Sequence, residues 1–131
     1  MSNIEATKFR FHPWHGLSLG EDSPKIVNCY VEMVPTDTIK YELDKITGIL
    51  KVDRPQKYSS LCPSLYGLLP QTYAGKNIAK FCESKTQMLD LVGDGDPLDV
   101  CILAENTFAH GDIIVRATPI GGFRLLDGEQ V

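Results

Sequence analysis

The chain has 131 residues, of which 43% are hydrophobic and 23% are charged. This length is enough for one compact domain and short for two. The formal net charge of −4 repels a phosphate backbone at long range, so no nucleic-acid partner is expected. The sequence shows neither a signal-peptide pattern nor an apolar run of membrane-spanning length. We therefore expect a soluble, cytoplasmic protein without a membrane partner.

The four cysteines are widely spaced, and no two of them form the C-x-x-C pair that is typical of zinc or redox motifs. A domain of this size does not need disulfides to be stable. The sequence therefore predicts four reduced and mostly buried thiols, at Cys29, Cys62, Cys82 and Cys101.

Residues 1–24 are mixed in character and end in the turn-prone run GEDSP, which predicts a peripheral arm before a domain over residues 25–131. Residues 26–34 (IVNCYVEMV) are rich in β-branched and apolar side chains and stop at Pro35. This pattern is typical of a strand, and it places Glu32 near the far end of that strand.

A hairpin is expected next. Apolar and charged side chains alternate over residues 39–44, which predicts a half-buried strand with its three charged side chains on one face. Thr47-Gly48 supplies a turn, and residues 49–53 can return as the second strand. Arg54 then lies at the end of this hairpin, close to the charged face.

The middle of the chain is less regular. Residues 55–73 contain three prolines and predict loop or edge structure with a bend at Tyr66-Gly67. Residues 76–88 indicate a short helix or an excursion hairpin. Apolar runs predict a buried strand followed by a strand pair, over residues 98–103, 113–120 and 122–126. Short strands with little helix favour a mainly β fold, a small barrel with a peripheral helix.

Three carboxylates, Asp94, Asp96 and Asp99, lie within six residues and have no basic residue among them. Like charges held this close raise one another's pKa values unless a cation neutralises them, so bound metal is the economical interpretation. Oxygen ligands favour hard ions such as Mg²⁺ or Mn²⁺ over zinc. In extended backbone, Asp94 and Asp96 would lie on one side about 6–7 Å apart. The alternatives are a solvated acidic turn or a calcium loop, although the closing glutamate of a calcium loop is missing.

The octapeptide GDGDPLDV over residues 93–100 resembles the D-x-D-P-x-D signature of family I soluble inorganic pyrophosphatases. Further segments follow in the order that this family uses: VEMVP at 31–35, IKYELDK at 39–45, VDR at 52–54 and YG at 66–67. The resemblance covers residues 26 to 127. It implies a five-stranded OB-like β-barrel (α+β in the full-length family), several Mg²⁺ ions with Mn²⁺ as a possible substitute, hydrolysis of pyrophosphate to two phosphates, and a homo-oligomer.

The resemblance also assigns roles residue by residue. Asp94 and Asp99 match metal ligands, and Asp99 matches the carboxylate shared by the two ions that hold the attacking water. Asp96 matches the general base that takes a proton from this water, in a mechanism through a metal-bridged hydroxide. Lys40 and Arg54 match cationic groups that bind phosphate oxygens.

Four further positions match the family. Glu42 resembles a ligand of a substrate-associated metal, and Glu32 a residue that acts through metal-bound water. Tyr66 matches a tyrosine whose hydroxyl points into the site and tunes the nucleophile, in contact with substrate. Asp127 matches a ligand of the third ion.

The sequence departs from the family in three respects. Cys62 stands where the family usually has an aromatic hydroxyl, and the segment between Tyr66 and Asp94 is longer than in compact bacterial members. The aspartate, lysine and tyrosine-lysine groups that the family places after the position of Asp127 are not present before Val131. The first departure affects one substrate-side or pKa-tuning contact, and the second indicates a divergent branch of the family. The third predicts either a truncated piece of a longer enzyme, which is favoured, or a remnant, and in both cases low activity.

Two alternatives to a full enzyme stay open. One is a metal-binding OB-barrel fragment with little or no catalysis. The other is an oligonucleotide-binding barrel, which would need aromatic side chains interleaved with Lys and Arg where this sequence gathers carboxylates. Without the resemblance, Lys40, Glu42 and Arg54 would be interpreted as a solvated strand face with a cross-strand ion pair.

Overall fold

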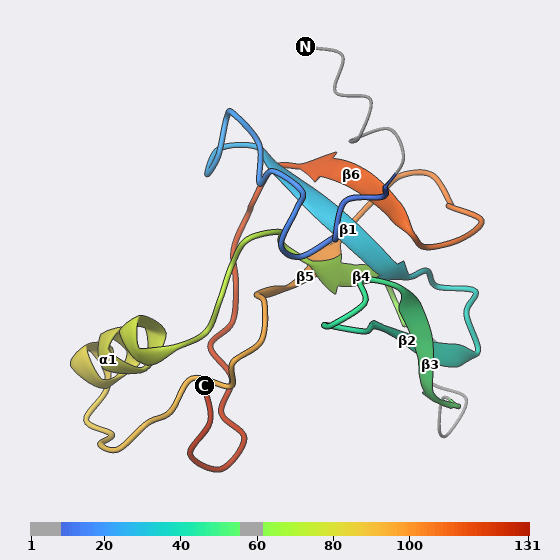
Figure 1. The fold of residues 1–131 in the computed structure, drawn as a ribbon. Coiled ribbons are helices and arrows are strands. Elements are labelled where there is room, and N and C mark those ends of the chain that lie inside the picture. The colour runs from blue at the N-terminus through green and yellow to red at the C-terminus, as the bar shows by residue number, and fades with distance from the viewer. Residues whose placement is uncertain (1–8, 56–61) are drawn as a thin grey trace.

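The computed structural model describes residues 9–55 and 62–131. Four strands form an antiparallel sheet in the order β5-β4-β1-β6, and β2 and β3 form a separate hairpin beside it (Figure 1). The mainly β fold with one short helix is confirmed, while closure into a five-stranded barrel stays a prediction. The elements are β1 Val27–Met33, β2 Ile39–Leu43, β3 Leu50–Pro55, β4 Leu65–Leu68, α1 Lys76–Lys85, β5 Asp99–Ile102 and β6 Ile113–Ala117.

Strand β1 is the centre of the sheet, and both of its faces are covered. Alternate side chains such as Cys29 and Val31 pack into one cluster with Leu65 and Ile102. Tyr30 points to the opposite face, where its cluster includes Trp14, Leu43 and Leu68. The apolar run that predicted this strand reflects burial on two sides, and the prediction is confirmed.

The prediction of loop or edge structure for residues 55–73 is wrong at β4, which is an inner strand between β1 and β5. Gly67 is the reason. A Cβ at this position would lie 1.8 Å from the carbonyl oxygen of Tyr30, so only glycine lets β4 approach β1 this closely. The sequence analysis interpreted the same glycine as a bend.

The β2–β3 hairpin is confirmed, with Lys40 opposite Arg54 and Glu42 opposite Lys51. Gly48 adopts a φ of +73° in its turn, a conformation that favours glycine. The hairpin is tied to the sheet at Leu43, whose backbone N–H donates a 2.6 Å hydrogen bond to the Glu32 carboxylate on β1. This bond fixes the charged face of the hairpin beside β1.

The predicted strand over residues 122–126 is wrong: only β6 forms in that region. The chain after β6 instead turns back beside the acidic segment (Figure 1). Val131 N donates to Val92 O at 2.9 Å, and Asp94 N donates to Val131 O at 3.1 Å. The side chains between β6 and Val131 are exposed, and Phe123 is 96% exposed.

Helix α1 confirms the helical alternative for residues 76–88. Its buried residues Ala79 and Cys82 form a small cluster with Leu91 and Val131, and the helix lies apart from the sheet (Figure 1). No helix among residues 9–55 and 62–131 has the length and apolar character of a membrane span.

All four cysteines are free thiols, as predicted. Cys29 and Cys82 are buried, and Cys62 is partly exposed. Cys101 was expected in the core but is exposed, because β5 lies at one edge of the sheet. Strand 98–103 was predicted as fully buried, whereas in β5 only Ile102 is buried.

Candidate metal and phosphate site

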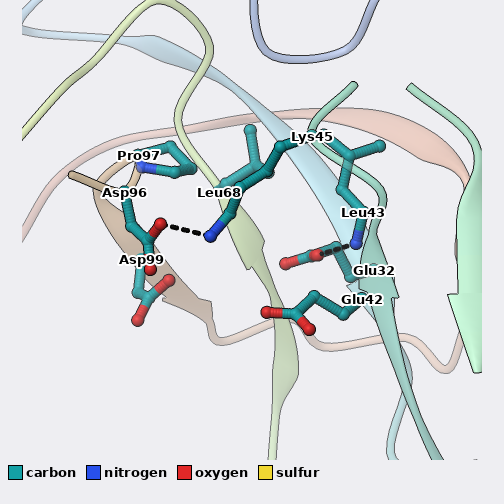
Figure 2. A pocket seen from close by; sticks show the side chains of 8 residues that line it. All are labelled: Glu32, Glu42, Leu43, Lys45, Leu68, Asp96, Pro97 and Asp99. Carbon is teal, nitrogen blue, oxygen red and sulfur yellow. Dashed lines mark hydrogen bonds and ion pairs between the residues drawn. The ribbon is translucent and has the colours of Figure 1, made fainter. Parts of the chain in front are cut away.

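A small cleft of about 40 Å³ lies between the β1–β2 region and the loop that enters β5. It has room for an ion or a few waters. Figure 2 shows Asp96 and Asp99 on one side and Glu32 and Glu42 on the other, with Leu68 between them. The lining residues are Glu32, Glu42, Leu43, Lys45, Leu68, Asp96, Pro97 and Asp99. Four of the carboxylates predicted from the sequence therefore meet in one place.

The loop before β5 is a turn and not the extended segment that the sequence analysis assumed. Gly95 has a φ of +77°, and the backbone N–H of Asp96 donates to the Asp94 carboxylate at 2.9 Å. Ala74 anchors the turn, accepting from Gly95 N and donating to Asp96 O, both at 2.9 Å. Asp96 faces the cleft as a result, while Asp94 stands beside it and is not among the lining residues.

Asp99 begins β5 directly opposite the end of β4, and its carboxylate accepts a hydrogen bond from the Tyr66 hydroxyl. Burial raises the pKa of Asp99, with the charges of Asp94 and Asp96 adding to it, against the lowering effect of the Tyr66 hydrogen bond. Burial and the charge of Asp99 raise the pKa of Tyr66 in turn. The phenol therefore stays protonated and acts as a donor.

Glu32 is only 6% exposed. Burial raises its pKa to about 7, with contributions from the charges of Asp99 and Glu42, although the hydrogen bond from Leu43 N lowers it. A carboxylate with this pKa is about half protonated at neutral pH. The cleft therefore holds more negative charge than its surroundings neutralise.

The sequence analysis missed Lys45, which reaches across the cleft and forms an ion pair with Asp96 (Figure 2). Burial lowers the pKa of Lys45, but the hydrogen bond to Asp96 and the charges of Asp96, Glu42 and Asp94 outweigh it and the pKa is raised. The only signal in the sequence was its position directly after the alternating charges of residues 39–44. Its partner is 51 residues away, so nothing local indicated the pair.

The predicted phosphate ligands Lys40 and Arg54 lie outside the lining of the cleft. Lys40 Nζ is 3.3 Å from Asp53 Oδ2, and Arg54 Nε is 4.0 Å from the same oxygen. The charge of Lys40 still acts on the site, because it lowers the pKa values of Glu32 and Asp99.

Asp127 lies in a turn at the C-terminal end, where its backbone exchanges two 3.0 Å hydrogen bonds with Gln130. It is not among the cleft-lining residues, so the structure does not bring it to the other carboxylates. Its role as a metal ligand stays a prediction.

The donor set suits a hard divalent cation, because the carboxylates supply only oxygen ligands and destabilise one another's charge. Within the described ranges, no three His, Cys, Asp or Glu side chains converge tightly enough, as they are arranged, to hold an ion. Lys45 neutralises part of the charge in this arrangement. The chemistry of the donors thus fits a metal.

Comparison with known proteins points to one family. The family described as "Pyrophosphatase: Inorganic pyrophosphatase" matches residues 29–131. An inorganic pyrophosphatase of Chlamydia trachomatis is 51% identical over 119 residues, which cover 91% of this chain and 57% of that protein. A soluble inorganic pyrophosphatase of rice, Oryza sativa subsp. japonica, is 36% identical over 131 residues, covering 99% of this chain and 52% of the relative.

Solved structures agree with this. The type I inorganic pyrophosphatase from Toxoplasma gondii aligns with a TM-score of 0.70 at 25% identity, over 95% of this chain and 56% of that one. The enzyme from Thermus thermophilus aligns with a TM-score of 0.62 at 26% identity, over 83% and 51%. The chain thus spans about half the length of these relatives. Together with Asp96 and Asp99 of the signature at one cleft, these matches show that the chain belongs to the family I inorganic pyrophosphatases.

Proposed function

We propose that this chain catalyses the metal-dependent hydrolysis of inorganic pyrophosphate to two phosphates. The observation that carries the proposal is the cleft in which Asp96 and Asp99 face Glu32 and Glu42. The proposal includes a five-stranded OB-like barrel over residues 25–131 and, as the family resemblance implies, a cytoplasmic homo-oligomer.

The residues that would hold Mg²⁺ are Asp94, Asp99 and Glu42, with Glu32 acting through water and Asp127 as a more distant ligand. Mg²⁺ is the expected ion, and Mn²⁺ its expected substitute. When bound, it would supply Lewis-acid polarisation of phosphate oxygens and of the attacking water. The pKa values of Glu32 and Asp99 are raised, which supports this assignment, because a bound cation would stabilise the charged carboxylates and lower their pKa values.

Side chains of the protein supply the remaining catalytic and substrate-binding roles. Asp96 takes the proton of the attacking water as general base. Tyr66 donates to Asp99 and, as the family resemblance implies, its hydroxyl tunes the nucleophile and contacts substrate. Lys40 and Arg54 bind phosphate oxygens and offset the charge that gathers on the leaving phosphate. Lys40 must exchange its contact with Asp53 for the substrate to do so.

Phosphate release from pyrophosphate, with and without Mg²⁺, tests this function. We expect release that requires the metal and that Asp96→Asn lowers by at least about 100-fold, the scale of a lost general base.

The matched control is Asp90→Asn. Asp90 is an exposed aspartate outside the cleft, and its φ of 60° is one that asparagine tolerates. This control should retain the wild-type rate. Absence of both Mg²⁺ binding and phosphate release from the wild type would refute the proposed function.

A further inference from the structure

Lys45 joins two elements of the site that are far apart in the sequence. It follows β2 in the hairpin turn, and its ammonium pairs with the Asp96 carboxylate on the loop before β5. Both side chains line the same cleft, and each is about two-fifths exposed, at 41% and 43%. Water reaches the pair, so the contact can open without unfolding its surroundings.

The other two lysines of the β2–β3 hairpin are engaged elsewhere. Lys40 pairs with Asp53 at 3.3 Å, and Lys51 pairs with Asp44 at 3.8 Å. Both of these pairs stay within the hairpin and its turn. Of the ion pairs in the described part of the chain, only that of Lys45 connects the hairpin with the acidic loop.

Three carboxylates act on the Lys45 ammonium: Asp96 by direct contact, and Glu42 and Asp94 through their charge. A divalent cation among these carboxylates would meet the ammonium as a like charge. The proposed reaction also requires Asp96 to leave its ion pair with Lys45 before its carboxylate can accept a proton, because an ion-paired carboxylate is a weaker base. The Lys45 ammonium and a bound cation would therefore repel each other among the same carboxylates of the cleft.

We propose that Lys45 is a built-in counter-ion that competes with the divalent cation for the carboxylates of the cleft and thereby weakens and tunes metal binding. This inference rests on the proposed function, since the cation is the one that the reaction needs. Lys45 acts through Asp96 and its neighbours and is a positioning residue. Its ion pair with Asp96 keeps the acidic loop and the hairpin together when no metal is bound, and this ion pair opens when the metal binds.

The test is calorimetric titration of Mg²⁺ into metal-free protein. Lys45→Met keeps most of the length of the unbranched side chain and removes its charge, so we expect Mg²⁺ to bind on the order of tenfold more tightly. Lys45→Arg keeps the charge and should restore weak binding. Lys51→Met is the matched control, because it changes the net charge equally from the same hairpin but acts on a pair outside the cleft; its affinity should stay within about twofold of the wild type.

A second measurement uses thermal unfolding. In chelator, Lys45→Met should melt below the wild type because the cluster loses its counter-ion, and added Mg²⁺ should raise its Tm more than it raises that of the wild type. Unchanged or weaker Mg²⁺ binding in Lys45→Met would overturn the inference. Equal tightening in Lys51→Met would also overturn it, since the effect would then be one of net charge.

Phosphate release measured on the same samples separates this inference from the proposed function. If the wild type hydrolyses pyrophosphate with Mg²⁺ while Lys45→Met binds the ion no more tightly, only the role of Lys45 is wrong. If no variant binds Mg²⁺ and none releases phosphate, the proposed function fails and this inference fails with it.

Discussion

Replacing Glu32 by glutamine should stabilise the metal-free protein at alkaline pH. The pKa of this buried carboxylate is raised from 4.5 to about 7, so folding disfavours its ionised form. The resulting destabilisation is absent below the unfolded value, grows as the pH rises from 4.5 to 7, and is constant above that range. At about 1.4 kcal/mol for each tenfold change in proton affinity, the full effect is about 3 kcal/mol.

The assay is chemical denaturation in chelator at pH 5 and pH 8. Glutamine keeps an oxygen that can accept the hydrogen bond from Leu43 N, so the variant should gain about 1 kcal/mol at pH 5 and as much as about 3 kcal/mol at pH 8. In saturating Mg²⁺ this advantage should shrink, because the cation stabilises the ionised glutamate of the wild type.

Glu83→Gln is the control for this experiment. Glu83 also accepts a backbone hydrogen bond, at 2.9 Å from Leu91 N, but it is partly exposed and lies outside the cleft. Its substitution controls for the loss of a carboxylate that accepts a backbone N–H, and it should not give the large gain expected of Glu32→Gln. A difference between Glu32→Gln and the wild type that does not change with pH would refute the argument from burial.

Three further results are expected. Gly67→Ala should lower the free energy of unfolding by more than about 2 kcal/mol in chemical denaturation, because its Cβ would collide with β1; Gly121→Ala, with no atom within 4 Å, should not. Cys101 should be alkylated rapidly in the native protein and Cys82 only on unfolding; equal rates by mass spectrometry would contradict this placement. Tyr66→Phe should move the acidic limb of the pH–rate profile upwards, because the carboxylate at the start of β5 loses a donor; an unshifted limb would exclude that contact from the mechanism.

The sequence predicted the parts of the fold that repeat a short pattern. The apolar run of β1 and the alternating charges of the hairpin are local signals, and both elements formed where expected. Strand β4 was missed because Gly67 has two possible meanings, a bend or a close approach of two strands, and only the position of β1 decides between them. Residues 122–126 are apolar enough for a strand, but in the described part of the chain they pair with no other strand.

The same distinction holds for the site. The signature carboxylates Asp96 and Asp99 identified the cleft because they are close in the sequence. The partnership of Asp99 with Tyr66 and that of Asp96 with Lys45 depend on how distant segments meet. Local spacing carries no information on such contacts, which is why the sequence named Tyr66 without its partner and did not name Lys45.

The separate cluster under α1 has a consequence for motion. Among the described residues, the apolar cluster that holds this helix is small: Ala79, Cys82 and Leu91, with Val131 packed against them. Its opening therefore exposes little apolar surface, and its amides should exchange with solvent long before those of β1. Ala74, just before the helix, bonds Gly95 and Asp96. A fluctuation that begins in α1 should therefore reach the loop that carries Asp96, the proposed general base, while the sheet stays intact.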